Sequence, residues 1–434
     1  MYLRNRVLVV LQWIALGLAV GAACGFGSAG FLALLDRATQ FRIEHERIVY
    51  TLPLAGIVLG LVYERWGKEI KGGNNLVLDT VHADGKEIPF RMAPMVVGGT
   101  ILTHLFGGSA GREGTAVQMG ASFADYIAHR LGLHHELRRQ LLAAGIAGGF
   151  GAIFGTPIAG MLFGLEVVWV GRMEYHALLP ALVAAVVGDV VTRGCGIVHT
   201  PYPTLAAQAM TPALALKWLV VGIVVAATAT AFVELTHGIK HLLEKRVPRL
   251  PVRMMLGGAV VVVMWKLIGT SDYLGLGLPT IVRAFVDPTL PWYAFAVKLV
   301  FTAVTLGAGF LGGEVTPLFF IGATLGAVLG RWLGIPLELA AGVGLAGVFA
   351  AAANTPVALS IMAVELLGAH VLPHAMIVCV LAYILTGHRG IYPSQRLTRF
   401  KTGRRSLAEA VALRDAHTVS EPPSSSQLPS DEGG

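Results

Sequence analysis

The stretch GREGT at residues 111–115 recurs as GGEVT at residues 312–316, 201 positions further along the chain. A Gly-Ala pair follows each copy, at residues 120–121 and 322–323. Both copies combine glycines, one carboxylate and a Thr directly before an apolar segment. This repeated turn decides the interpretation of the rest of the sequence.

Two further matches keep the same order along the chain. Residues 73–76 (GNNL) match residues 275–278 (GLGL) at an offset of 202, and residues 156–159 (TPIA) match residues 355–358 (TPVA) at an offset of 199. Three matches in one order at nearly one offset indicate that the chain consists of two homologous halves.

The composition is that of a membrane protein. Of the 434 residues, 55% are hydrophobic and 14% are charged, whereas soluble domains carry about 25% charged residues. The net charge of +7 is spread between apolar runs, which argues against the single basic face of a nucleic-acid binder. Many apolar segments are too short to cross a hydrocarbon core about 30 Å thick. We predict an all-α polytopic protein with short, broken membrane helices, as in transporters and channels.

The distribution of basic residues predicts the orientation of the halves. Arg4 and Arg6 precede an apolar run that extends to about residue 35, too long for a signal peptide, so we predict an uncleaved first helix and a cytoplasmic N-terminus. A basic run at residues 240–253 follows the apolar segment 212–237. If that run is cytoplasmic, this segment ends inside the cell while its counterpart in the first half ends outside, and the halves are inverted.

The repeat and the tail composition define three predicted parts. Residues 1–206 form a first membrane repeat, residues 207–403 form a second, inverted membrane repeat, and residues 404–434, rich in Pro and Ser, form a disordered cytoplasmic tail. Basic residues after residue 388 place the C-terminus in the cytoplasm as well.

The repeated turns predict an anion site. Thr-Pro pairs at residues 156–157, 316–317 and 355–356 predict helix starts, with Thr as N-cap and Pro as the first helical residue. Helix N-termini that follow glycines present unpaired N–H groups and the positive end of the helix dipole. Several such ends meeting in the membrane would bind an anion without a full positive charge.

Glu113 is the residue of greatest interest. We predict that this carboxylate, at the start of a helix beginning near Thr115, competes with an anion for the same N–H groups and leaves when it is protonated. Glu113 would then be both gate and proton carrier, as suits an ionisable residue in an apolar turn. Alternatively, it is a helix-start carboxylate at an interface or an ion-pair partner of Arg112. Glu314 has the same local setting, with a structural relic of duplication as the alternative.

Three other ionisable residues have structural interpretations. Glu166 and Glu365 lie about ten residues into their predicted helices, so we expect them to be structural or bonded to partners. His104 lies in an apolar run, where a hydrogen-bonded helix residue is more common than a proton relay.

These motifs resemble the CLC family of anion channels and proton-coupled anion antiporters. Residues 111–114 resemble its gating-glutamate motif, residues 312–317 occupy the place of its Gly-x-Phe-x-Pro turn, and residues 73–77 that of its Gly-Ser-Gly-Ile-Pro turn. Tyr392 matches in position the family tyrosine whose hydroxyl points at the anion. The resemblance covers about residues 8–395.

The departures from the family pattern are similar to those of its fluoride-exporting branch. Asn74 or Asn75 replaces the anion-contacting Ser, Thr115 replaces the Pro after the gating motif, and Glu314 replaces the aromatic residue of the second-half turn. Fluoride is strongly hydrated, and amide N–H donors replace its water better than a lone hydroxyl does.

The resemblance therefore implies a set of site residues. It assigns gating and proton transfer to Glu113 and Glu314, and anion binding to Asn74, Asn75, Tyr392, Gly114, Val315 and Thr316. Where chloride antiporters have a second Glu for the inner proton step, Glu166 is followed by Val167, which makes Glu314 the candidate for that step.

Alternatives remain open for some of these residues. Asn74 and Asn75 are also suited to a turn or an N-cap. Tyr392 is also explained as an interfacial tyrosine. Thr316 is also explained as a helix cap, although its hydroxyl could bond Glu314 or the anion.

The function implied is a fluoride/proton antiporter that exports fluoride across the inner membrane of a bacterium, as a homodimer with both termini cytoplasmic. A chloride/proton antiporter or a passive anion channel of the same family is the alternative. We expect no cofactor, metal or nucleic-acid partner. A membrane-embedded hydrolase is a remote alternative, since residues 134–136 (HHE) lack the second spaced His of a zinc motif and the sequence has no nucleophile elbow.

Overall fold

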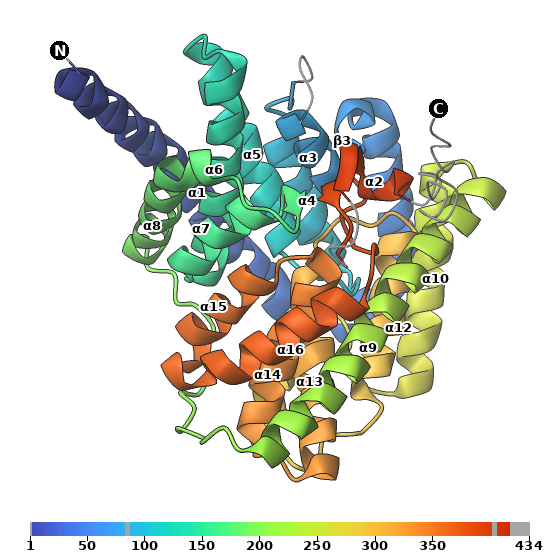
Figure 1. The fold of residues 1–434 in the computed structure, drawn as a ribbon. Helices are drawn as coiled ribbons and strands as arrows, with labels where there is room; N and C mark the ends of the chain where they lie inside the picture. Colours follow the sequence, from blue (N-terminus) through green and yellow to red (C-terminus); the bar gives the residue numbers. More distant parts are fainter. Residues whose placement is uncertain (1, 83–86, 402–405, 417–434) are drawn as a thin grey trace, which may run out of the picture.

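The computed structural model describes residues 2–82, 87–401 and 406–416, and it is almost entirely helical (Figure 1). The α-helices of the described residues fall into two series of eight. The first series is α1 (Tyr2–Glu44), α2 (Leu52–Trp66), α3 (Asn74–His82), α4 (Met92–Leu105), α5 (Glu113–Arg130), α6 (His135–Phe154), α7 (Pro157–Glu166) and α8 (Leu178–Gly194). The second series is α9 (Pro212–Arg246), α10 (Leu250–Ile268), α11 (Leu278–Val286), α12 (Ala294–Gly307), α13 (Val315–Leu333), α14 (Leu337–Ala353), α15 (Pro356–Leu367) and α16 (Leu372–Leu385).

The two series correspond helix for helix and in their turns. Gly73 and Gly275 both have a φ of 56°, and Gly132 and Gly334 have φ values of 60° and 61°. Each pair is 202 residues apart, and such positive φ angles favour glycine because a Cβ atom would clash with the backbone. In Figure 1, α1 descends from the upper left whereas α9 rises from the bottom of the molecule. The predicted all-α fold with an inverted repeat is confirmed.

Short connections complete the fold. Five 3-10 helices occur in the described chain: η1 (Glu46–Thr51), η2 (Lys68–Ile70), η3 (Tyr175–Ala177), η4 (Ala369–Val371) and η5 (Leu413–Asp415). A small sheet joins β1 (Trp169–Val170) in parallel to β2 (Arg396–Arg399), which pairs antiparallel with β3 (Ser406–Ala412).

Strand β3 lies within residues 404–434, for which the sequence predicts disorder. The structure differs there because β2 offers a pairing edge and because four apolar residues bury one another. These residues are Val170, Leu397, Leu413 and Ala416. Residues 404–405 and 417–434 of the predicted tail lie outside the described residues.

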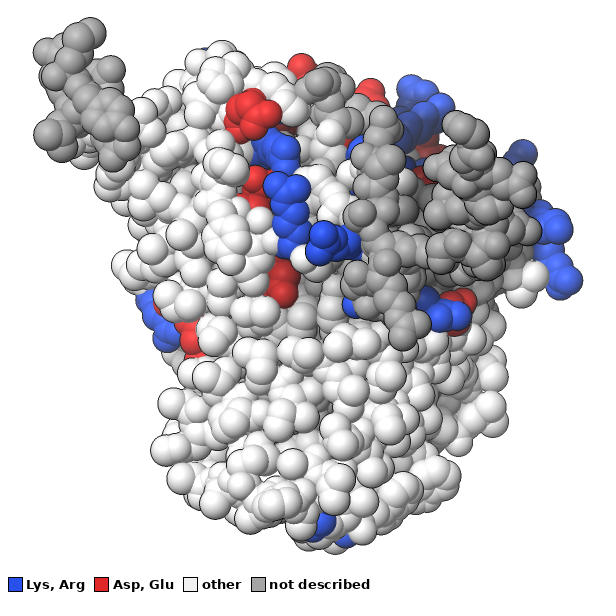
Figure 2. Space-filling view, in the orientation of Figure 1, with Lys and Arg blue, Asp and Glu red and all other residues white. Residues whose placement is uncertain are grey.

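Six segments of the described chain are long and apolar enough to cross a membrane: Val7–Glu44, Glu46–Trp66, Tyr175–Gly194, Pro212–Arg246, Leu250–Ile268 and Val315–Leu333. Other apolar helices have only 10–17 residues, such as α7 and α15. Figure 2 shows a broad band without charged side chains between a charged upper part and the lower rim. Helix α13 is almost wholly buried inside the protein, so it is a central element rather than a lipid-facing one.

The central helix pairs approach each other through glycines. A Cβ atom on Gly120 of α5 would lie 2.2 Å from the carbonyl oxygen of Gly145 of α6. The equivalent pair in the second repeat, Gly322 of α13 and Gly344 of α14, has the same 2.2 Å separation. Small residues allow backbones in a membrane protein to approach this closely. These two crossings fix the starts of α5 and α13 relative to the rest of the fold.

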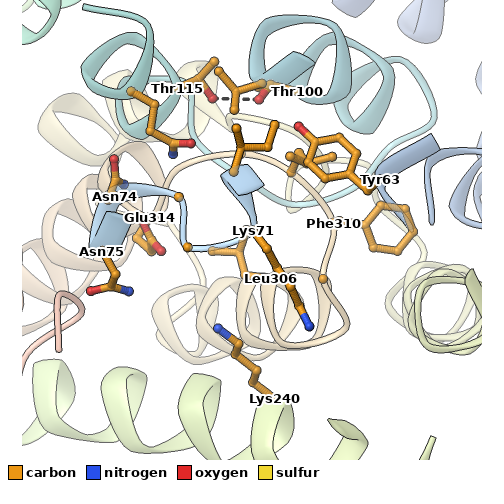
Figure 3. Close-up of a pocket in the computed structure, with 18 of the residues that line it drawn as sticks. Tyr63, Lys71, Asn74, Asn75, Thr100, Thr115, Lys240, Leu306, Phe310 and Glu314 are labelled. Atoms are coloured by element: carbon orange, nitrogen blue, oxygen red, sulfur yellow. Dashed lines mark hydrogen bonds between the residues drawn. The ribbon is translucent and has the colours of Figure 1, made fainter. Parts of the chain in front are cut away.

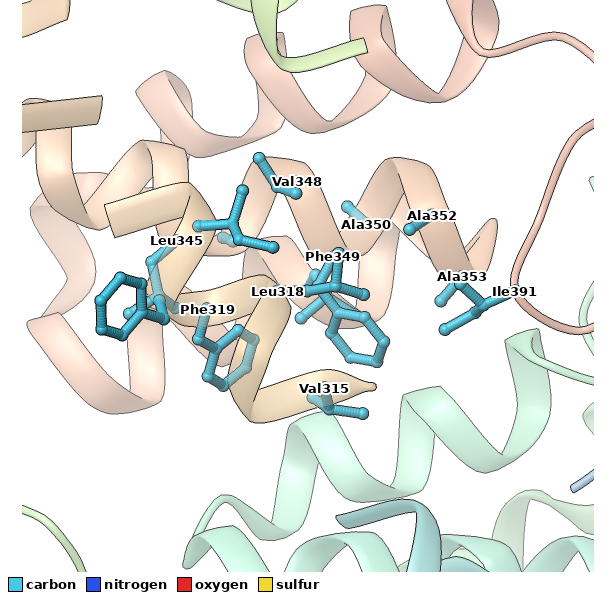
Figure 4. Close-up of a cluster of buried hydrophobic side chains, with 14 of the residues drawn as sticks. Val315, Leu318, Phe319, Leu345, Val348, Phe349, Ala350, Ala352, Ala353 and Ile391 are labelled. Atoms are coloured by element: carbon cyan, nitrogen blue, oxygen red, sulfur yellow. The ribbon is translucent and has the colours of Figure 1, made fainter. Parts of the chain in front are cut away.

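Apolar side chains on α13 and α14 complete this support. Figure 4 shows Val315, Leu318 and Phe319 of α13 beside Leu345, Val348 and Phe349 of α14, with Ile391 at one end of the cluster. Phe319 and Phe349 meet edge to face, with ring centroids 5.7 Å apart. The first turn of α13 is therefore held by packing on a rigid neighbour.

The predicted threonine caps are wrong at all three Thr-Pro pairs. Helix α13 begins at Val315, so Thr316 lies inside its first turn and not at the cap position. Helices α7 and α15 begin at their prolines as expected, but Thr156 and Thr355 make no side-chain cap. Among the described residues, neither hydroxyl oxygen has a hydrogen-bond partner. A different side chain accepts the free N–H groups at the starts of α7 and α15.

That acceptor is a glutamate from the opposite repeat. Each carboxylate accepts two backbone N–H bonds of 2.7–3.2 Å, from Ile158 and Ala159 to Glu365 and from Val357 and Ala358 to Glu166. A carboxylate satisfies two N–H groups and the helix dipole together, whereas a threonine hydroxyl satisfies one N–H group. The prediction that Glu166 and Glu365 are bonded to partners is confirmed.

The glycine crossing yields a stability prediction. Gly322→Ala is expected to lower the stability of the folded protein by about 1–3 kcal/mol, because the added methyl group forces α13 and α14 apart. The midpoint of thermal aggregation in detergent, followed by size-exclusion chromatography, measures this change. Gly98→Ala in α4 is the matched control, since its Cβ atom would meet nothing within 4 Å. Equal midpoints for the two variants would show that the crossing tolerates a methyl group.

Candidate functional site

The turns before α5 and α13 pair with each other. The N–H of Gly111 donates to the carbonyl of Gly313 at 2.6 Å, and the N–H of Gly313 donates to the carbonyl of Gly111 at 2.8 Å, as an isolated antiparallel bridge. A Cβ atom on Gly313 would lie 2.6 Å from the backbone nitrogen of Gly114. Glycine is therefore needed where the two repeats touch, and the starts of α5 and α13 are held face to face.

The Glu113 side chain crosses this bridge. It is fully buried, and its Oε1 atom accepts a 2.5 Å hydrogen bond from the hydroxyl of Thr316. Its Oε2 atom accepts bonds of 3.1 Å from the backbone N–H groups of Thr316 and Arg112. The carboxylate thus occupies the N-terminus of α13.

This placement corrects one expectation about Glu113. The sequence predicts a carboxylate bound at the start of its own helix, near Thr115. Instead, α5 begins at Glu113 itself, and a side chain in the first turn of a helix points back towards the preceding residues. From there it reaches the opposite repeat across Gly111, where a Cβ atom would lie 2.9 Å from the Glu113 Oε2 atom.

The predicted alternative for Glu113 is also present. The Arg112 Nε atom lies 3.4 Å from the Glu113 Oε1 atom, and both side chains are largely buried. The guanidinium compensates a carboxylate charge that would otherwise be isolated in the protein interior. Glu113 is therefore both an ion-pair partner and the cap of α13.

The first turn of α13 has few free donors. Val315 and Thr316 begin the helix, and Pro317 in the third position has no N–H group. Thr316 gives both its N–H and its hydroxyl to Glu113, while the Val315 side chain packs in the apolar cluster of Figure 4. Any group that replaces the carboxylate would gain the same donors.

A cavity of about 200 Å³ lies on one side of the bridge (Figure 3). Several of the predicted site residues line it together: Asn74, Asn75, Glu314 and Tyr392. Thr115 lines it as well, and its hydroxyl bonds that of Thr100 at 2.7 Å. Glu113 is not among the residues that line this cavity. The backbone at Gly114 and Gly313 therefore lies between the Glu113 carboxylate and the open space.

The two asparagines have different surroundings. A Cβ atom on Gly114 would lie 2.9 Å from the Asn74 Nδ2 atom and 3.8 Å from the Glu314 Oε2 atom. Among the described residues, neither the Asn74 Oδ1 atom nor the Glu314 Oε2 atom has a hydrogen-bond partner. The Asn75 Oδ1 atom, by contrast, accepts a 3.1 Å bond from the N–H of Ser394. Both asparagines line the cavity, and Asn75 in addition fastens the segment that carries Tyr392.

Several cavity residues are absent from the sequence-based prediction. Gln118 lies one helical turn after Gly114, on the same face of α5, and lines the cavity while being 8% exposed. The spacing of four residues between Gly114 and Gln118 indicates that both lie on one face of a helix. Lys71 and Lys240 line the cavity as well. In the sequence, Lys240 stands out only as part of the basic run that predicts the orientation of the chain.

His104 has a structural place, as predicted. Its Nδ1 atom lies 2.8 Å from the carbonyl oxygen of Thr100, and its Nε2 atom lies 2.9 Å from that of Ala110. The ring therefore ties the end of α4 to the turn before Gly111.

The arrangement can exchange one anionic group for another. Two helix N-termini converge where a carboxylate is held, and a second carboxylate and an amide lie beside Gly114 at the end of the cavity. A small anion would find there the N–H donors that now hold Glu113.

Comparison with known proteins identifies the family. Residues 55–387 match the sequence model of the family described as voltage gated chloride channel. A relative from Pseudomonas syringae pv. tomato, named chloride/fluoride channel protein, is 45% identical over 412 residues, which cover 94% of this chain and 91% of the relative. A solved CLC-type fluoride/proton antiporter matches with a TM-score of 0.87 and 36% identity, covering 89% of this chain and 98% of that chain.

The fold also extends to more distant proteins. A slow cyanobacterial Cl−/H+ antiporter matches with a TM-score of 0.77 at 17% identity, covering 86% of this chain and 94% of that chain. The relatives are named as channels and antiporters, which agrees with a transport protein rather than an enzyme. Because the family match spans more than half of the sequence and the Pseudomonas relative is similar along nearly its whole length, the chain belongs to the CLC family of voltage gated chloride channels.

Proposed function

We propose that this protein is a fluoride/proton antiporter that exports fluoride from the bacterial cytoplasm. The observation that carries the proposal is the Glu113 carboxylate on the N-terminus of α13, next to a cavity that ends at Asn74 and Glu314. The names of the similar proteins support fluoride and protons as the two substrates.

Glu113 acts as gate and proton carrier by competition. In its charged form the carboxylate holds the N–H and hydroxyl of Thr316. Protonation removes the charge that the helix dipole attracts and weakens these bonds. Fluoride then takes the freed donors of Thr316, Val315 and Gly114, and its departure lets the carboxylate return and release the proton.

Asn74 contributes the fluoride preference. Fluoride must regain in the protein the donors that it loses from water, and a side-chain amide offers two N–H donors where a serine offers one O–H. The Asn74 amide nitrogen lies against Gly114, where the anion passes into the site. Asn75 has the supporting role, because its bond to Ser394 positions Tyr392 as a further anion ligand.

Glu314 carries the inner proton step. Its Oε2 atom has no hydrogen-bond partner among the described residues, and the side chain lines the cavity. Glu166 is engaged on the N-terminus of α15 and is followed by Val167, so neither position offers a free carboxylate. Glu314 is near Gly114 and so close to the gate across the bridge.

The same proposal places the chain in the inner membrane, as a homodimer with both termini cytoplasmic and with repeats at residues 1–206 and 207–403. The start of α1, the sheet strands and most of the basic side chains in view lie at the upper side of the molecule (Figures 1 and 2). Positive residues favour the cytoplasmic side of a membrane. The upper side is then cytoplasmic, and the cavity opens towards it.

Glu113→Gln is expected to abolish proton movement coupled to fluoride, because the amide keeps the size of the side chain but carries no charge. Proteoliposomes with a fluoride electrode outside and a pH-sensitive dye inside measure both fluxes. Glu338→Gln, at an exposed position in the first turn of α14, is the control and should behave as wild type. Undiminished proton transport by Glu113→Gln would eliminate Glu113 as carrier.

Asn74→Ser is expected to lower the fluoride-over-chloride permeability ratio roughly 10- to 100-fold, because one hydrogen bond to a charged group contributes roughly 1.5–3 kcal/mol and each 1.4 kcal/mol is about tenfold. Reversal potentials in fluoride and chloride gradients measure the ratio. Asn75→Ser is the matched comparison and should change the ratio less. If the wild type moves chloride as fast as fluoride, the fluoride assignment fails while the family assignment stands.

A further inference from the structure

Gln118 is a buried polar side chain that the proposed transport cycle does not use. It lies on α5, lines the cavity that ends at Asn74 and Glu314, and is 8% exposed. Within the part of the chain that the structure describes, its amide makes no hydrogen bond to another residue. A buried amide without a partner costs free energy unless a ligand or water supplies the missing bonds. The open space in front of Gln118 is therefore the place where its partner binds.

The amides of Gln118 and Asn74 reach across one gap from opposite sides. The Gln118 side chain extends from α5 to the turn before α3, where a Cβ atom on Gly73 would lie 3.6 Å from the Gln118 Nε2 atom. The Asn74 side chain extends from α3 to α5, where a Cβ atom on Gly114 would lie 2.9 Å from the Asn74 Nδ2 atom. The two amides thus flank one opening between α3 and α5, at the end of the cavity shown in Figure 3.

The second repeat shows that helix packing does not require a polar side chain at this position. Phe320 lies 202 residues after Gln118, at the same distance before the matching glycine of its repeat, and it is fully buried. Its ring centroid lies 5.9 Å from that of Tyr273 and 5.3 Å from the Lys298 Nζ atom. The residues 202 positions before Tyr273 and Lys298 both line the cavity. The second repeat therefore fills the equivalent space with side chains, whereas the first repeat leaves it open in front of an amide.

The charges around the cavity do not by themselves select one anion. Lysine, arginine and glutamate side chains all line it, namely Lys71, Lys240, Arg253, Glu244 and Glu314. Arg253 pairs with Glu244 at 3.2 Å, and a charged Glu314 carboxylate offsets one lysine. Coulomb forces act on all monovalent anions alike, whereas fixed hydrogen-bond donors distinguish anions by size and hydration. The neutral donors of the cavity are therefore the groups that determine its preference among anions.

We propose that Gln118 is a second amide ligand of the transported anion, opposite Asn74, and a determinant of anion specificity. The role of Asn74 and the identity of the anion rest on the proposed function. A side-chain amide carries two N–H donors, so the pair offers donors from two walls of the cavity. These donors replace part of the hydration shell after the anion has left bulk water and before it reaches the N–H groups of α13.

Anion binding to the purified protein in detergent tests this without transport. Isothermal titration calorimetry with sodium fluoride measures the Kd of the wild type, Gln118→Met and Gln118→Glu. Met keeps the length of the side chain and removes its donors, whereas Glu keeps the shape and replaces the donors by an acceptor oxygen. Gln140→Met is the matched control, because Gln140 lies on α6 and is not among the residues that line this cavity. Size-exclusion chromatography of each variant verifies that it folds.

Gln118→Met is expected to raise the fluoride Kd roughly 10- to 100-fold, through the loss of one hydrogen bond to a charged group. Gln118→Glu at alkaline pH should raise it at least as much, and Gln140→Met should keep the wild-type Kd. The double variant with Asn74→Ser should depart from the product of the two single effects, because neighbouring ligands of one ion are coupled. An unchanged Kd in the Gln118 variants would overturn the proposal. Single effects that multiply without coupling would also overturn it, because the two amides would then not share one ion.

Two further outcomes are separable. Because Glu has the shape of Gln, Gln118→Glu decides the result if Gln118→Met does not fold. If the wild type binds and transports chloride in preference to fluoride, the proposed function fails. Titration of the same variants with sodium chloride then decides whether Gln118 is an anion ligand: a raised chloride Kd would retain the ligand role, and an unchanged one would eliminate it.

Discussion

The site depends on one constraint, which is that the unpaired N–H groups at the start of α13 need an acceptor inside the membrane. Pro317 removes one donor from this turn, and Thr316 concentrates two donors at one point. Glu113 meets the need from the other repeat, across the two hydrogen bonds that join Gly111 and Gly313. The carboxylate is held by the donors of Thr316 and by the Arg112 guanidinium, and protonation of Glu113 would weaken both attractions.

The same principle occurs twice more in the fold with a different outcome. Glu166 and Glu365 cap α15 and α7 across the repeat interface, each with two backbone N–H bonds. These carboxylates lie near the ends of their own helices, and neither lines the cavity that ends at Asn74; Glu166 lines a separate hollow of about 560 Å³. The duplicated chain thus uses one interaction for structure at two helix starts and, in our proposal, for gating at the third.

The sequence predicts the repeat and the position of the site well, because duplication leaves visible matches and because charge is rare in a membrane chain. It also brings Asn74, Glu314 and Tyr392 into one group through family resemblance, and the structure places them around one cavity. It misassigns the acceptor at α7 and α15, since the capping glutamates are about 200 residues away from the helices they cap. The reach of Glu113 to Thr316 is missed for the same reason. Long-range pairing of this kind depends on three-dimensional packing, which the local helix-start pattern does not encode.

The central claim is that the Glu113 carboxylate and the anion compete for one set of helix N–H groups. Protonation of Glu113 decides which of them is bound, so that proton movement and anion movement drive each other. The most direct measurement is fluoride movement against its own gradient in proteoliposomes with the wild-type protein and a pH difference as the only driving force. The account predicts that fluoride accumulates on the more acidic side and that the accumulation collapses when the pH difference is removed. Fluoride that moves only down its own gradient, whatever the pH difference, would contradict it.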